Sequence, residues 1–415
     1  MEAKSNEVKI AIAGLRQGMY VSRLDRPWIE SPFMFEGLMV SNEGLLARVQ
    51  ALCKYVYVDI ARGARPDARF VQVEATPAAQ RGVFLSEFAA LRSTTWTVKS
   101  DVEEELPVAE KAHHHLERGI EEMMTDLHAG RELEMGRLRE GVGAMIDSVT
   151  RNPSAFAWLK AIRKKSSYAY QHALGCSVWA ASFGRHLGMN REEIDDLAFA
   201  GLLFDVGKTR LPSDLLEKSG PFEDSDHQQM RVHVRASVEI LEHTPGITPR
   251  TLQAVASHHE RHDGSGYPKG LKGATIPIFG RLIGLIDSYD AMTSTRPYAA
   301  ARSPHQAVME LYNTRDGLFQ ADLVEQFIQT CGVYPTGSMV ELSDGRVGVV
   351  TAVHDLKRLR PSVMVLLDAD KRPLPEFLAL DMSQIEADAQ GRLLTIRRGL
   401  PEGSHGIDPA ELFLD

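Results

Sequence analysis

The spacing of hydrophobic and polar residues changes along the chain and divides it into four segments. In the first, apolar residues alternate with polar or small ones at Val8, Ile10 and Ile12, and again over residues 55–60. This alternation predicts two half-buried strands. The run 45–53 between them has the apolar content of a short helix. We therefore predict a small α+β module over residues 1–70.

The second segment, residues 71–150, is rich in charged residues and in helix formers, with Leu and Met at helical spacing. We expect a helical connector here. Two interpretations stay open, because long amphipathic helices can pair in a homodimer or form one layer of a helical domain. The consecutive residues His113, His114 and His115 do not predict a metal site, since neighbouring helix positions point about 100° apart. A solvated helix face is the favoured interpretation for them.

The third and fourth segments differ again in period. Residues 151–332 carry an apolar stripe typical of helices, at Ile194, Leu197 and Leu202, and a helix start with Ser303 as N-cap and Gln306 at the capping-box position. Residues 333–415 change to β-rich runs around the hairpin turn 343–345. The predicted fold is mainly α: a helical bundle with a small N-terminal α+β module and a small C-terminal β appendage.

Composition and charge narrow the class of protein. The 415 residues are 43% hydrophobic and 25% charged, as in an ordinary globular protein. A formal charge of −9 argues against salt-driven binding of polymeric nucleic acid but permits a small anionic ligand. The three widely spaced cysteines indicate reduced thiols. The charged start is no signal peptide, and no apolar run approaches the about 18 residues of a membrane span. We expect a cytoplasmic protein.

Histidine and aspartate residues recur through the third segment, each separated from the next by about one helix and a loop. They are His172, Asp205, His233, the pair His258 and His259, and Asp287. A helical bundle can bring one ligand from each helix to a common centre. Four imidazoles and two carboxylates suit one or two transition metal ions: Fe, Mn, Ni or Zn. Two such ions about 3.5–4 Å apart can clamp a phosphoryl group and generate hydroxide at neutral pH.

The local sequences around these residues are more specific than their spacing. Residues 204–208 read Phe-Asp-Val-Gly-Lys, and residues 258–268 read His-His-Glu-Arg-His-Asp-Gly-Ser-Gly-Tyr-Pro. With the runs 286–294 and 296–298, they resemble the HD-GYP domain, the metal-dependent cyclic di-GMP phosphodiesterase branch of the HD hydrolases. The resemblance extends from about residue 172 to residue 312. Residues 15–59 are also similar to a module often found ahead of this domain.

The resemblance implies an HD-type bundle and assigns a role to each matching residue. Asp205 would bridge two metals, His233, His258 and His259 would complete one site with it, and His172 and Asp287 would belong to the other. Lys208 would contact the scissile phosphate as a point-charge donor. Other residues implied to bind substrate are Tyr267, Asp290 and Arg296. His262, although four residues after His258, is not included, because the Asp-Gly break disrupts the helix that chelation would need.

Three positions depart from the family pattern. Phe204 replaces the histidine of the family's His-Asp doublet, so one metal site loses an imidazole. Tyr168 stands where some members have a glutamate for a third metal, so a third metal is not expected. Ala299 follows Arg-Pro-Tyr, where a basic residue is common, which removes one phosphate contact.

Two functions of different class follow. The first is an enzyme of bacterial signal transduction that hydrolyses cyclic di-GMP to pGpG or GMP through a metal-activated hydroxide, with activity reduced by Phe204. The second is a degenerate domain that acts as a cyclic di-GMP receptor or protein-interaction module without turnover. The family ligands retained around Phe204 favour the enzyme. A third, weaker interpretation is hydrolysis of another nucleotide phosphate.

Overall fold

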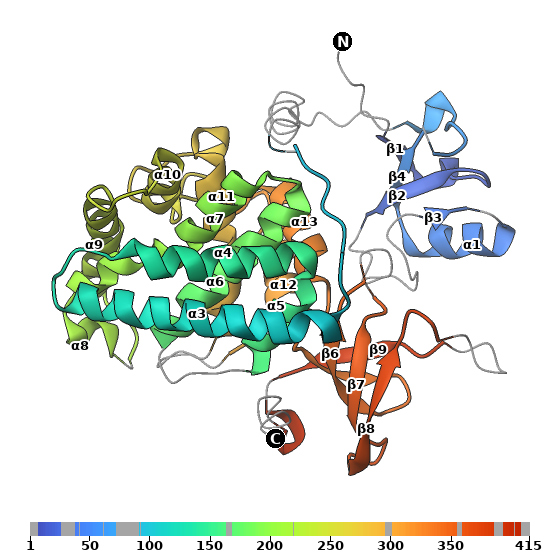
Figure 1. Cartoon of the computed structure of the whole chain (residues 1–415). Helices are drawn as coiled ribbons and strands as arrows, with labels where there is room; N and C mark the ends of the chain where they lie inside the picture. Colours follow the sequence, from blue (N-terminus) through green and yellow to red (C-terminus); the bar gives the residue numbers. More distant parts are fainter. Residues whose placement is uncertain are drawn as a thin grey trace. The chain divides into compact units, whose positions relative to one another are not determined.

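The computed structural model describes most of the chain, in two compact units. The described residues are 7–25, 38–40, 42–60, 62–71, 91, 93–162, 168–218, 220–294, 301–354, 359–385, 393–401 and 403–407. One unit comprises residues 1–82 with 355–359, and the other comprises residues 83–354 with 360–415. Both units are drawn in Figure 1.

The N-terminal unit is a four-stranded antiparallel sheet with one helix. Its strands are β1 (Glu7–Ala11), β2 (Tyr20–Leu24), β3 (Leu38–Met39) and β4 (Tyr55–Asp59), in the order β1-β4-β2-β3. Helix α1 (Glu43–Leu52) starts at Asn42, whose side chain accepts a hydrogen bond from the Leu45 amide. Val56 and Val58 are fully buried, while Tyr55 and Tyr57 are half-buried. The predicted strand alternation and the small α+β module are confirmed.

The second unit is built on helices, and all of them except α8 (Ser213–Leu216) contribute residues to one hydrophobic core. They are α3 (Val102–His128), α4 (Met135–Arg151), α5 (Pro153–Ile162), α6 (Tyr168–Leu187), α7 (Arg191–Leu203), α8 (Ser213–Leu216), α9 (Asp224–Leu241), α10 (Pro249–Ser257), α11 (Ile278–Thr293), α12 (Pro304–Asn313) and α13 (Ala321–Cys331). Short 3-10 turns, among them η4 (Val206–Arg210), connect some of them. The predicted helix start is present, since Ser303 and Gln306 form a capping box before α12.

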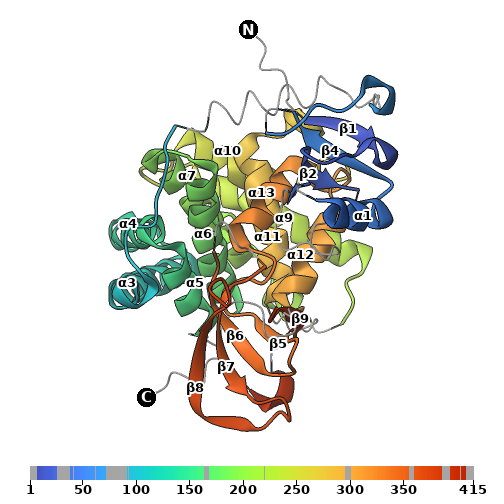
Figure 2. The same cartoon turned by 90° about the vertical axis from the view of Figure 1, so that its right-hand side faces the viewer.

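Helices α3 and α4 form a layer of this unit, and Figures 1 and 2 show them side by side. Leu116 and Ile120 of α3 and Met145 of α4 are fully buried in the core that α6 and α7 also share. Of the two interpretations of the connector, the structure shows the layer of a helical domain. Pairing in a homodimer stays a prediction. One interpretation was wrong in part: His113 is buried at 3% exposure and packs near Phe156, because it lies on the inward face of α3.

The C-terminal part of this unit is a five-stranded antiparallel sheet. Its strands are β5 (Met339–Leu342), β6 (Val347–Ala352), β7 (Ser362–Leu367), β8 (Pro373–Asp381) and β9 (Ile396–Leu400), in the order β8-β7-β6-β5-β9. Gly345 has a φ of +89°, as the predicted β5–β6 hairpin turn requires. Trp158 of α5 is buried against Met339 and Val347 and joins the sheet to the helices. Among the described residues, no helix has the length and apolar character to cross a bilayer.

Candidate metal centre

The structure brings the predicted histidines and aspartates together from five elements. His172 lies on α6, His233 on α9 and Asp287 on α11, while Asp205 follows α7 and the pair 258–259 follows α10. Asp205 links the two halves of the cluster: its Oδ1 is 3.3 Å from His233 Nε2, and its Oδ2 is 3.8 Å from His172 Nε2. Asp287 contacts both His172, at 3.2 Å, and His259, at 3.9 Å. Residues separated by more than a hundred positions therefore meet in one polar cluster.

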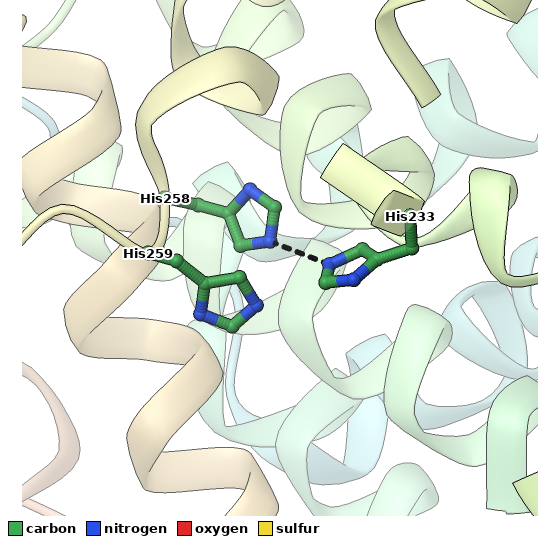
Figure 3. Close-up of side chains that lie close together, drawn as sticks. All are labelled: His233, His258 and His259. Atoms are coloured by element: carbon green, nitrogen blue, oxygen red, sulfur yellow. Dashed lines mark hydrogen bonds between the residues drawn. The ribbon is translucent and has the colours of Figure 1, made fainter. Parts of the chain in front are cut away.

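Three imidazoles form the first half of the cluster, and Figure 3 shows them pointing toward one another. One ligand atom from each of His233, His258 and His259 lies within 4.8 Å of the other two. The Nδ1 atoms of His233 and His258 donate to the carbonyl oxygens of Met230, at 2.6 Å, and Val255, at 2.7 Å. With the proton on Nδ1, each Nε2 presents a lone pair.

The two lone pairs face each other, because His233 Nε2 and His258 Nε2 are 3.4 Å apart. Such a pair needs a proton or a cation between the two nitrogens. Burial and the neighbouring His233 lower the pKa of His258 to about 4, and burial and His258 lower the pKa of His259 to about 2. Because protonation is disfavoured at neutral pH, the geometry fits a metal ion held by neutral imidazoles.

Asp205 supplies a carboxylate to the same point. Its Oδ1 is buried and has no hydrogen-bonding partner among the described residues, while Oδ2 pairs with the ammonium of Lys208 on η4. Burial opposes ionisation, but Lys208 and His233 lower the pKa of Asp205 well below its usual value. An ionised, unpartnered oxygen next to three neutral imidazoles is a donor set that suits Fe, Mn, Ni or Zn. The residues present therefore fit one transition metal ion.

The second half of the cluster has a different character. His172 Nδ1 is 2.9 Å from Asp290 Oδ2, and its Nε2 is 3.2 Å from Asp287 Oδ1. Burial lowers the pKa of His172, but Cys176, Asp287 and Asp290 raise it well above the usual value. This histidine is thus held between carboxylates, whereas the imidazoles of the other half are neutral.

Phe204 and Asp290 complete the surroundings of His172. The Phe204 ring is 1% exposed, and its centroid is 5.5 Å from that of His172 and 4.8 Å from that of His258. It offers no ligand atom. Asp290, proposed from the resemblance to bind substrate, is fully buried; its Oδ1 accepts from Lys160 Nζ at 2.5 Å, and its other oxygen faces His172. Asp290 therefore contacts the Nδ1 side of His172, whereas Asp287 contacts the Nε2 side.

The loop after His259 folds back over the cluster. The Glu260 carboxylate accepts hydrogen bonds from the amides of Lys269 and Leu271, at 2.7 and 2.8 Å. Gly266 is required by close packing, since a Cβ there would lie 2.4 Å from the His259 carbonyl oxygen. As a result the Tyr267 ring stacks on His259, with centroids 4.6 Å apart.

Some residues of the site were found by sequence reasoning and others were not. Glu260 was missed as a loop anchor, although it lies inside the His-His-Glu motif. Arg231, whose guanidinium lies 4.8 Å from the Tyr267 ring centroid, and Lys160 have no local sequence signal. The predicted Arg296, like Ala299, lies outside the described residues.

Comparisons with known families match three parts of the chain. Residues 157–323 match the HD domain, residues 7–138 match a domain of unknown function (DUF3391), and residues 339–386 match a KOW domain associated with the HD domain. Residues 157–323, which hold the metal centre, therefore carry the HD domain, which defines a class of hydrolases. The prediction of a hydrolase enzyme is confirmed at the level of this class.

Several curated relatives are named phosphodiesterases. The chain is 27% identical over 371 residues to cyclic di-GMP phosphodiesterase PA4108 of Pseudomonas aeruginosa, covering 89% of this chain and 87% of that protein. It is 35% identical over 170 residues to the cyclic di-GMP phosphodiesterase response regulator RpfG of Xanthomonas campestris, covering 38% and 44%. It is 33% identical over 144 residues to 3'3'-cGAMP-specific phosphodiesterase 1 of Vibrio cholerae, covering 35% and 33%.

The chain thus spans most of the first relative and less than half of the other two. Together with the HD-domain match, these relatives confirm the HD-GYP branch recognised from residues 258–268.

Proposed function

We propose that this protein is a metal-dependent phosphodiesterase that hydrolyses cyclic di-GMP to pGpG or GMP. The observation that carries the proposal is the convergence of His233, His258, His259 and the unpartnered Oδ1 of Asp205 on one point. A ligand set of this kind, next to an ammonium group, suits the cleavage of a phosphodiester.

Each residue of the centre has a distinct task in this reaction. The three histidines and Asp205 would hold the metal ion, which when bound supplies a Lewis acid that polarises a phosphoryl oxygen and lowers the pKa of a water molecule. Lys208 is about one-third exposed, so its ammonium can face both Asp205 and the phosphate of a substrate at the surface. Tyr267, stacked on His259, would fix the orientation of that ring and border the substrate.

The substrate is proposed from the relatives, two of which are named for cyclic di-GMP and one for 3'3'-cGAMP. The test is incubation of the purified full chain, supplied with Mn²⁺ or Fe²⁺, with each cyclic dinucleotide in turn. We expect chromatography to show pGpG or GMP from cyclic di-GMP, formed faster than any product of 3'3'-cGAMP. Equal or preferential cleavage of 3'3'-cGAMP would reject the substrate.

Phe204 favours a second candidate function, a cyclic di-GMP receptor without turnover. Its ring packs against the rings of His172 and His258 without offering a ligand atom, so the centre is incomplete relative to the family pattern. Binding of cyclic di-GMP by calorimetry, with no product after prolonged incubation at saturating metal, would support the receptor. The roles of Asp290 and Arg296 toward substrate, the homodimer and the cytoplasmic location stay predictions.

A further inference from the structure

We propose that this centre holds a single metal ion and that the ammonium of Lys208 takes the position of the second cation. The inference rests on the proposed function for its biological meaning, but it concerns metal binding and is measured separately. Three side chains around the second half of the cluster support this inference: Phe204, Asp205 and His172.

The Phe204 ring removes a donor where a second ion would need one. It is buried in van der Waals contact distance of the rings of His172 and His258, at centroid separations of 5.5 and 4.8 Å. A hydrocarbon edge at a metal site supplies no lone pair and excludes the water that could replace the missing ligand. The position between these two histidines is therefore apolar.

The two oxygens of Asp205 have different surroundings. Oδ1, unpartnered and buried, faces His233 and the three-histidine half, whereas Oδ2 is in contact with Lys208 Nζ. A carboxylate that bridges two metals needs both oxygens free for them. Here the oxygen on the side of His172 is occupied by a side chain that reaches it from three residues further along the same turn.

His172 lies between two carboxylates. Nδ1 lies 2.9 Å from Asp290 and Nε2 lies 3.2 Å from Asp287. Asp290 in turn is neutralised by Lys160 at 2.5 Å. Lys160 thus contacts Asp290 on the Nδ1 side of His172, and Lys208 contacts Asp205 Oδ2, which lies 3.8 Å from His172 Nε2. Both ammonium groups would repel a dication placed on this side of the cluster. The second half of the cluster is arranged as an ion-pair network in which Lys208 contacts Asp205, the carboxylate that also reaches the three-histidine site.

The experiment is Mn²⁺ binding to the metal-depleted full chain, followed by equilibrium dialysis and by electron paramagnetic resonance. We expect one equivalent per chain and the spectrum of isolated Mn²⁺, with no exchange-coupled pair at excess metal. Two equivalents with a coupled spectrum in the wild-type chain would overturn the inference.

Substitutions distinguish the effect of Phe204 on Mn²⁺ binding from that of Lys208. Lys208→Met should admit a second, weaker Mn²⁺, whereas Lys208→Arg, which keeps the charge, should retain one. Phe204→His should bind two, and adding Lys208→Met to it should tighten the second equivalent by about tenfold or more, since the competing charge is gone. If the second Mn²⁺ binds equally tightly to Phe204→His and to the double variant with Lys208→Met, Lys208 does not hold the second position.

A matched control is Lys218→Met, because Lys218 also pairs with an aspartate, Asp226, at 2.5 Å, outside the cluster. Its stoichiometry should equal that of the wild type. The two proposals fail separately: one bound Mn²⁺ without hydrolysis would reject the proposed function alone, and hydrolysis with two coupled ions would reject this inference alone.

Discussion

At the scale of single residues, the decisive feature is the replacement of a ligand by a phenyl ring. Phe204 lies between His172 and His258 with 1% of its surface exposed. We expect Phe204→His to raise the turnover of cyclic di-GMP by about tenfold or more, because the added imidazole supplies a ligand for a second metal ion at the phosphate. Steady-state kinetics at saturating Mn²⁺ measure it. Phe204→Leu, which adds no ligand, is the control, and a folded Phe204→His protein with unchanged or lower turnover would contradict the expectation.

Glu260 permits a second prediction at this scale. Its carboxylate accepts the amides of Lys269 and Leu271, and a glutamine offers only one oxygen for the two. We expect Glu260→Gln to destabilise the loop by about 1–3 kcal/mol, the cost of an unsatisfied buried group. Hydrogen exchange of the two amides should accelerate, while amides of α3 keep their rates. Equal protection in both proteins would show that the carboxylate does not hold the loop.

Sequence reasoning succeeded for some of these residues and failed for others for a physical reason. The ligands His258 and His259 lie in a compact motif, so they could be identified without coordinates. The contact of Lys160 with Asp290 joins residues 130 positions apart, and neither periodicity nor composition encodes it. The same holds for Arg231, whose position over Tyr267 depends on how α9 packs beside the loop.

At the scale of elements, an ion pair joins the first long helix to the second. The Glu105 side chain of α3, only 3% exposed, accepts from Arg151 Nε and Nη2 of α4 at 2.9 and 2.8 Å, and also from Ser100. Burial raises the pKa of Glu105, but the hydrogen bonds from Arg151 and Ser100 outweigh it, so the pKa is lowered overall. The carboxylate is therefore more acidic in the folded protein than in the unfolded chain.

The lowered pKa of Glu105 makes its contribution to the stability of the fold depend on pH. A lowered folded-state pKa contributes stability that is present above the unfolded pKa and is lost as the pH falls through the folded value. We expect Glu105→Gln to lower the free energy of unfolding by about 1–3 kcal/mol at neutral pH, and by progressively less in acid. Denaturant unfolding at a series of pH values measures the difference. A gap that is constant from neutral pH to acid would contradict the role of the charge.

The elements themselves were well predicted where the period was clear. Strands β5 and β6, which flank the hairpin turn 343–345, and the start of α12 fall where the pattern placed them, because alternation and capping are local signals. Strands β8 and β9 were not identified. In β8 three of the nine positions are half-buried, two of them at its end, and the other six are exposed, so no inward-outward alternation marks the strand.

At the scale of the whole molecule, the metal ligands connect helices that are distant in sequence. Asp205, His233, His258 and His259 follow or lie on α7, α9 and α10, so the ion binds the folded state and not the unfolded chain. We expect Mn²⁺ at a hundred times its dissociation constant to stabilise the helical unit by about 2.7 kcal/mol. Thermal unfolding with metal and with chelator measures the difference.

Two histidines of the same region provide the controls for that measurement. His233→Ala removes a proposed ligand and should abolish the effect of metal on unfolding. His243 is an exposed side chain just after α9, and its Nδ1 lies 3.0 Å from the Glu239 carbonyl oxygen. His243→Ala should therefore preserve the effect of metal on unfolding. Loss of the metal effect in both variants, or in neither, would contradict the assignment of His233.

The backbone carbonyls that hold His233 and His258 have a consequence for how the protein acquires its cofactor. Since Met230 and Val255 fix these rings from within their own helices, the cage is preorganised and loses little conformational entropy when an ion enters. Loading can therefore follow folding as a separate, reversible step. The supply of competing ions in the cell then contributes to which metal resides in the protein, since the affinity order of nitrogen and oxygen donors does not by itself select one divalent metal.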